Sequence, residues 1–75
     1  MEPYRNVAGN SGVDAYEIGP DYITIKFSDG SVYRYTYASA GQENVERMKG
    51  LAQAGQGLST FVSTTVSKLY ERKEA

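Results

Sequence analysis

Residues 22–37 read YITIKFSDGSVYRYTY, the pattern of two β-strands joined by a short turn. Apolar and polar residues alternate before the turn, and tyrosines occupy every second position after it. Successive side chains of a strand point to opposite faces, so each set lies on one side of its strand. The two sets are Ile23, Ile25 and Phe27 in the first strand, and Tyr33, Tyr35 and Tyr37 in the second. The tyrosines either complete the core of the protein or form a surface platform for a ligand.

The length of the turn decides between these alternatives. A two-residue turn at 29–30 pairs Ile25 with Arg34 and places a charge beside the isoleucines. A three-residue loop at 28–30 pairs Ile25 with Tyr33 instead, and a shift of one residue reverses the face of every side chain. The loop sequence SDG suits a type I turn followed by a glycine in the left-handed conformation. We therefore predict the three-residue loop, which turns Tyr33 and Tyr35 inward as core.

A further strand is expected at 13–18, VDAYEI, before a turn that contains proline. Pairing Ile18 with Ile23 and Tyr16 with Ile25 keeps the apolar residues of both strands on one face. Together the strands form a three-stranded antiparallel meander with one apolar face.

The hydrophobic period changes after the strands, which predicts two helices. Ser39 and Gln42 fit a capping box at the start of the first helix, which ends at the glycines of 55–57. Gly50 lowers the stability of this helix by about 1 kcal/mol relative to alanine, so we expect a weak point there. Apolar residues recur at amphipathic spacing over 58–70, which predicts the second helix, with Lys68 and Arg72 near its C-terminal end. The fold class is therefore α+β, a three-stranded antiparallel meander with two C-terminal helices packed on one face.

The chain has 75 residues, enough for one domain. Residues 1–12 are polar, with three glycine or proline positions, and are expected to form a flexible or loosely attached arm before a single domain at 13–75. The formal net charge of −1 disfavours strong non-specific nucleic-acid binding but allows a local basic patch. The longest apolar run is too short to cross a membrane, and the N-terminus is unlike a secretory signal, so we expect a soluble cytoplasmic protein.

The order of these motifs resembles the KTSC domain, a family found at the C-terminus of some lysyl-tRNA synthetases and as small stand-alone bacterial or phage-related proteins. The resemblance covers residues 12–72 and depends on two short motifs. The first is Tyr33-Arg34-Tyr35 after DGSV, and the second is Gly57-Leu58-Ser59-Thr60-Phe61, with Val66 and Tyr70 following. The resemblance implies the α+β fold and motif residues Tyr33, Tyr35, Gly57 and Phe61. It also implies RNA binding, which is suggested for the family.

The composition disfavours catalysis and metal binding. The sequence contains neither cysteine nor histidine, which excludes disulfides and argues against a zinc, iron or copper site. The carboxylates are scattered over turns and polar helix faces, and no glycine-rich phosphate loop follows a strand. We therefore expect a non-enzymatic binding module without a metal or cofactor.

The polar face of the meander is the first choice for a ligand. It combines basic and aromatic side chains, which can hold a phosphate and stack on a base. We expect RNA or a nucleotide-like anion to bind there. The candidate residues are Arg34, Lys26, Tyr22, Tyr37, Lys68 and Arg72. The simpler interpretation is an ordinary solvated face of an antiparallel sheet.

A protein-interaction or self-association module is the alternative function, and its partner is then a second copy in a homo-oligomer. A core this small often needs such support. A neutral stripe on the second helix offers a contact surface, formed by Thr60, Ser63, Thr64 and Ser67.

Overall fold

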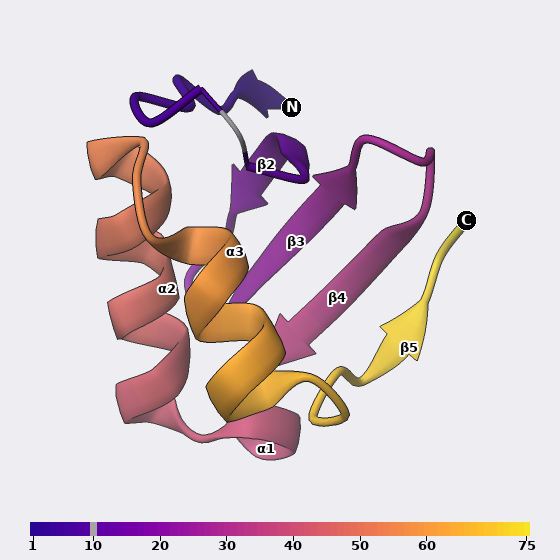
Figure 1. The fold of residues 1–75 in the computed structure, drawn as a ribbon. Helices are drawn as coiled ribbons and strands as arrows, with labels where there is room; N and C mark the ends of the chain where they lie inside the picture. The colour runs from indigo at the N-terminus through magenta and orange to yellow at the C-terminus, as the bar shows by residue number, and fades with distance from the viewer. Residues whose placement is uncertain (10) are drawn as a thin grey trace.

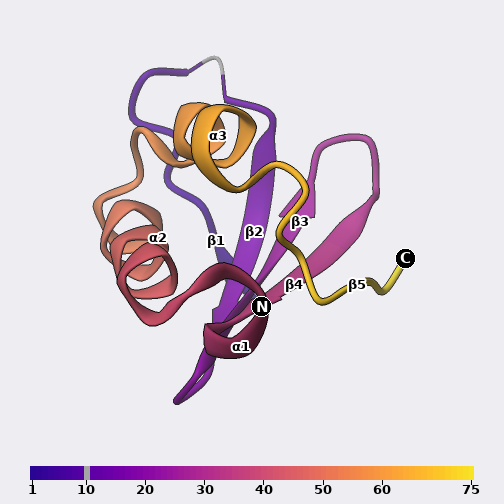
Figure 2. The ribbon, with the colours of Figure 1, turned by 90° about the horizontal axis from the view of Figure 1, so that it is seen from below.

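The computed structural model describes residues 1–9 and 11–75, and the strands largely precede the helices along the chain. The strands are β1 (Glu2–Pro3), β2 (Val13–Ile18), β3 (Tyr22–Phe27), β4 (Val32–Thr36) and β5 (Arg72–Lys73). The helical elements are α1 (Tyr37–Ala40), α2 (Gln42–Ala54), α3 (Leu58–Phe61) and the π-helical segment η1 (Val62–Val66). The strands form one antiparallel sheet in the order β1-β2-β3-β4-β5, and α2 and α3 lie on one side of it (Figures 1 and 2). The α+β class is confirmed, whereas the expected three-stranded meander is wrong because short strands are added at both edges.

The β3–β4 hairpin has the predicted three-residue loop. Ile25 lies opposite Tyr33, and Ile23 lies opposite Tyr35. Gly30 closes the loop with φ of 90°, a left-handed conformation that glycine adopts without steric cost. This register turns Tyr35 inward, where only 1% of its surface is exposed. The tyrosines of β4 are therefore part of the packing beneath the helices.

The β2–β3 pairing is also confirmed, with Ile18 opposite Ile23 and Tyr16 opposite Ile25. Nearer the start of β2 the register shifts by one residue, as in a β-bulge. The shift places Val13 in the buried core and leaves the neighbouring Asp14 exposed.

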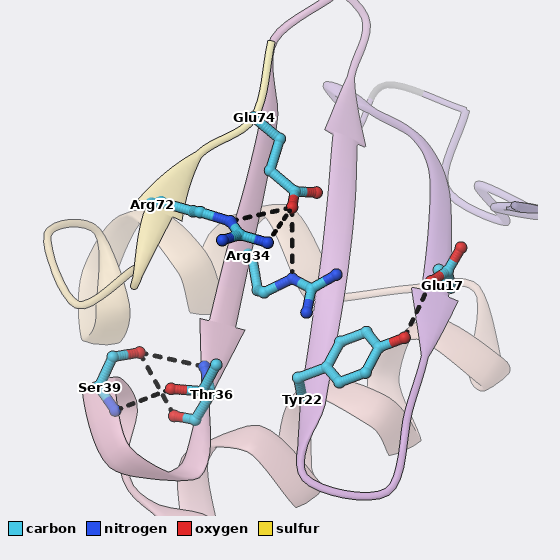
Figure 3. A network of polar contacts seen from close by, with 7 residues as sticks. All are labelled: Glu17, Tyr22, Arg34, Thr36, Ser39, Arg72 and Glu74. Carbon is cyan, nitrogen blue, oxygen red and sulfur yellow. Dashed lines mark hydrogen bonds and ion pairs between the residues drawn. The ribbon is translucent and has the colours of Figure 1, made fainter.

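The first predicted helix is divided into α1 and α2 at Gly41. The N-cap is Thr36 and not Ser39: Thr36 Oγ1 accepts from Ser39 N, and Ser39 Oγ accepts from Thr36 N, both at 3.0 Å (Figure 3). This capping box starts α1, whereas α2 follows Gly41 without a side-chain cap. Gly50 does not interrupt α2, so the expected weak point is not a break.

The second predicted helix is shorter than the spacing over 58–70 indicated. It changes to π-helical geometry at η1 and ends at Val66. Ser63 Oγ and Thr64 Oγ1 both donate to the carbonyl oxygen of Thr60, at 3.1 and 2.8 Å. Such side-chain bonds compete with the helical backbone pattern, and so they help to explain the early end of the helix.

The chain beyond η1 returns to the sheet. The Tyr70 ring packs against Tyr33 with centroids 4.8 Å apart, and against Tyr35 edge-on at 6.3 Å. The segment then runs along β4 as β5, which places Arg72 opposite Arg34. Arg72 therefore lies in an edge strand and not at the end of a helix.

The core lies between the sheet and the helices. Its buried residues are Tyr4, Val13, Ile23, Ile25, Tyr35, Ala40, Val45, Met48, Ala52, Leu58, Val62 and Val66. Burial raises the pKa of the Tyr35 hydroxyl to about 12, because the interior disfavours the charged phenolate. Within residues 1–9 and 11–75, no helix is both long and apolar enough to cross a membrane.

The segment expected to be a loose arm, 1–12, contacts the domain through residues 2–5. It supplies β1, and Tyr4 is buried with its hydroxyl accepting from Leu58 N at 3.3 Å. Arg5 Nη2 donates to two carbonyl oxygens at the C-terminal end of α2, at 2.8 and 3.1 Å. Position 10 of this segment lies outside the described residues. A boundary at residue 13 therefore does not separate an arm from the packed structure.

Candidate functional site

The face of the sheet opposite the helices carries the candidate site. Alternation along β3 and β4 places Tyr22, Thr24 and Lys26 on this face, beside Arg34 from the neighbouring strand. The buried isoleucines and Tyr35 occupy the other face. The helices lie on one side of the sheet (Figure 2), and the same alternation that builds the core gathers polar and basic side chains on the other side, some of which Figure 3 shows.

Tyr22 lies across this face between β2 and β4 (Figure 3). The guanidinium carbon of Arg34 is 4.2 Å from the centroid of the Tyr22 ring, a cation–π contact. Tyr22 Oη donates to Glu17 Oε2 at 2.9 Å. This hydrogen bond is the main cause that raises the pKa of the Tyr22 hydroxyl above its ordinary value. The tyrosine therefore fixes one side of the Arg34 guanidinium.

Gly19 leaves the space that Tyr22 occupies. A Cβ atom at position 19 would lie 1.9 Å from Tyr22 Cε1, far inside van der Waals contact. The glycine in the β2–β3 turn is thus required by the position of the ring and not by a left-handed backbone.

Glu74 lies between the arginines of β4 and β5 (Figure 3). Its Oε2 atom accepts from Arg72 Nε at 3.1 Å and forms an ion pair with Arg72 Nη2 at the same distance. Arg34 Nε is 3.4 Å from the same oxygen, an ion-pair contact without the geometry of a hydrogen bond. Two guanidinium groups therefore share one carboxylate oxygen.

Some side-chain donors and acceptors on this face have no partner among the described residues. Thr24, opposite Arg34 in the sheet, is 2% exposed, and its Oγ1 atom has no hydrogen-bond partner in the described part of the chain. A buried hydroxyl without a partner costs about 1–3 kcal/mol. Neither terminal nitrogen of Arg34 has a hydrogen-bond acceptor among residues 1–9 and 11–75. These atoms remain free to contact a ligand.

The structure brings together only some of the six predicted site residues. Tyr22, Lys26, Arg34 and Arg72 lie on the uncovered face. Tyr37 instead begins α1, where its hydroxyl donates to Glu46 Oε2 of α2 at 2.5 Å. That hydrogen bond is the main cause that raises the Tyr37 pKa.

Lys68 lies in the turn after η1 and has no polar side-chain partner within the described residues. Sequence reasoning placed it beside Arg72 on one helix, an arrangement that disappears when the helix ends early. It also missed Glu74. Glu74 lies just after β5, two positions from Arg72, and this spacing is a signal only if the segment is assigned as extended.

The four residues of the KTSC-like motif lie in the core or at a turn of the fold. Tyr35 is buried, and Tyr33 is half-buried between the rings of Phe27 and Tyr70. Gly57 precedes α3 with φ of 81°, and Phe61 is half-buried against the core. These residues explain the fold more directly than they explain binding.

Comparisons with known proteins do not assign the chain to a class: no family model, no curated protein and no solved structure matches it. The similarity to the KTSC domain thus stays a prediction. Among the described residues, no group of three or more carboxylates is placed to hold a metal ion.

Replacing Gly19 by alanine is expected to move the Tyr22 ring and break its contacts with Glu17 and Arg34. The fold should persist, because the backbone of Gly19 is not left-handed. The Tyr22 pKa should then fall toward its ordinary value, since the Glu17 hydrogen bond is the first cause of the rise. A pH titration followed by ¹³C NMR of the tyrosine Cζ atoms measures this change.

Gly12→Ala is the matched control, because a Cβ atom there has no neighbour within 4 Å. It should leave the Tyr22 titration unaltered. An unchanged Tyr22 pKa in Gly19→Ala would show that the ring does not occupy the described position.

Proposed function

We propose that the protein is a non-enzymatic binding module whose uncovered sheet face binds an anionic ligand, namely RNA or a nucleotide. The observation that supports it most is the Arg34 guanidinium, which is stacked on Tyr22 while its terminal nitrogens have no acceptor in the described chain. Stacking holds the plane of the group, and the free nitrogens can donate to a phosphate or a base edge.

The charges around Arg34 favour an anion. Lys26, Arg34 and Arg72 are basic, whereas Glu17 and Glu74 are the carboxylates that contact the same network. These three basic residues outnumber the two carboxylates bonded within the network, although Asp21 also lies close enough to act on Tyr22 and the whole chain has a net charge of −1. A local patch of this kind supports selective contact with a few phosphates and not with a long stretch of nucleic acid.

Titration of a short single-stranded RNA at low ionic strength tests the proposal. We expect Arg34→Ala to weaken binding about tenfold or more, because charge-assisted hydrogen bonds contribute about 1.5–3 kcal/mol. The dependence of log Kd on log salt should also become shallower by about 0.7 for each phosphate that the variant no longer neutralises. Fluorescence anisotropy measures both quantities.

Arg47→Ala is the matched control. Arg47 is exposed on α2, on the helical side of the sheet, and has no polar side-chain partner within the described residues. It should change the affinity less than twofold. Equal losses in both variants would indicate a general charge effect, and no RNA or nucleotide binding at high micromolar protein would refute the proposal.

Self-association is the second candidate function. Leu69 and Tyr70 remain exposed beside the aromatic cluster, which gives an apolar surface for another copy. The hydroxyl stripe supports this less, because Ser63 and Thr64 already donate to their own helix. Light scattering over a concentration series tests it, and a monomeric mass throughout would refute it.

Cytoplasmic location and membership of the KTSC family are also proposals.

A further inference from the structure

Glu74 holds the two arginines of the candidate site in an unusual way. Its Oε2 atom forms ion pairs with both Arg34 and Arg72, while its Oε1 atom has no polar contact within residues 1–9 and 11–75. The side chains of Arg34 and Glu74 are 26% and 28% exposed, so a ligand in solvent can reach this pair. The carboxylate therefore lies in an accessible gap between two guanidinium groups.

A single carboxylate does not match the charge and the hydrogen-bond donors of the two guanidinium groups. It carries one negative charge, whereas the two guanidinium groups carry two positive charges and five N–H donors each. A phosphate group supplies more acceptor oxygens and, as a monoester, up to about two negative charges. The charge and donor geometry between Arg34 and Arg72 thus fit a phosphate better than the carboxylate they hold.

We propose that the Glu74 carboxylate occupies the position of a ligand phosphate, and that the phosphate displaces it when it binds between Arg34 and Arg72. The inference rests on the proposed function for the kind of ligand. It adds where the ligand phosphate binds and which side chain competes with it. Displacement needs no unfolding of β5. The Glu74 amide donates to Val32 O at 2.6 Å, so the backbone stays in place while the side chain rotates.

The geometry also explains why Arg72 belongs to the site. The pairing of β5 with β4 sets Arg72 directly opposite Arg34. Their guanidinium groups reach the same oxygen from adjacent strands, as Figure 3 shows. Arg34 lies between this position and the Tyr22 ring, so one guanidinium group would contact both the phosphate and the aromatic ring (Figure 3).

The test compares Glu74→Gln with the unaltered protein, using AMP, adenosine and a short single-stranded RNA as probes. Glutamine keeps the shape of the side chain and removes the competing charge. We expect AMP and RNA to bind about fivefold more tightly, since an exposed ion pair typically contributes a few-fold in equilibrium constant and Glu74 forms two. Adenosine, which lacks phosphate, should bind with unchanged affinity.

Glu71→Gln is the control for charge alone. Glu71 is exposed in the same segment, and its side chain has no polar partner in the described structure. It should change AMP affinity less than twofold.

Equal tightening in both variants, tightening toward adenosine, or weaker AMP binding by Glu74→Gln would each overturn the inference. If the unaltered protein binds RNA through Arg34 but Glu74→Gln binds it no more tightly, the proposed function stands and the phosphate position falls. If neither protein binds any probe at millimolar concentration, both fall.

Discussion

Replacing Tyr35 by alanine should lower the free energy of unfolding by about 3–5 kcal/mol, the range for removing a large aromatic side chain from a core. Tyr35 is 1% exposed, lies opposite Ile23 and meets the Tyr70 ring edge-on. A chain of this size has a total stability of about 4–11 kcal/mol. The variant should therefore lose at least about 12 °C in Tm and approach the limit of folding. Thermal and urea unfolding followed by circular dichroism measure the loss.

Tyr35→Phe separates the ring from its hydroxyl. Tyr35 Oη has no hydrogen-bond partner among the described residues, so its removal breaks no hydrogen bond within them. This control should cost less than about 1 kcal/mol. A loss below about 1.5 kcal/mol for Tyr35→Ala would place the ring outside the core. That result would reopen the interpretation of the tyrosines as a binding platform.

The central hairpin could be predicted because its constraints agree. Alternation in β3 and β4 and the SDG loop each specify the same register, and a slip of one residue would bury Arg34 beside Ile25. The cost of that alternative is large enough for the sequence to exclude it. The edge strands have no such constraint. β1 and β5 are two residues long, and their pairing depends on which edges of the sheet are left open.

The last helix shows why periodicity alone was insufficient. Leu69 and Tyr70 continue the helical spacing, yet both remain 40% exposed, and the Tyr70 ring packs against Tyr33 on the sheet. Apolar spacing shows that residues favour burial, and it does not show which surface buries them. The same error affected the predicted site. The positions of Arg34 and Tyr22 follow from strand alternation, but Glu74 contacts Arg34 only because the chain returns to the sheet as β5. The sequence shows Gly19 only as part of a turn, because the position of the Tyr22 ring is a tertiary property.

Replacing Tyr4 by alanine is expected to destabilise the protein by about 2–4 kcal/mol, although Tyr4 lies in a segment that reads as a polar arm. The ring is 7% exposed within the core, and its hydroxyl accepts from Leu58 N at the start of α3. Alanine would leave a cavity beneath α3 and remove the acceptor from that amide. Chemical denaturation gives the change in the free energy of unfolding, and hydrogen exchange at the Leu58 amide should become faster.

Two variants test whether this loss belongs to packing. Tyr4→Phe keeps the ring and removes only the hydrogen bond, so we expect a cost of about 0.5–1.5 kcal/mol. Val7→Ala changes an exposed apolar residue of the same segment and should have little effect. If Tyr4→Ala were no more destabilising than Val7→Ala, the segment would be a loose arm after all. The ordered series Tyr4→Ala, Tyr4→Phe and Val7→Ala would instead show that β1 and Tyr4 stabilise the start of α3, because Tyr4 is the residue of this segment that lies in the core.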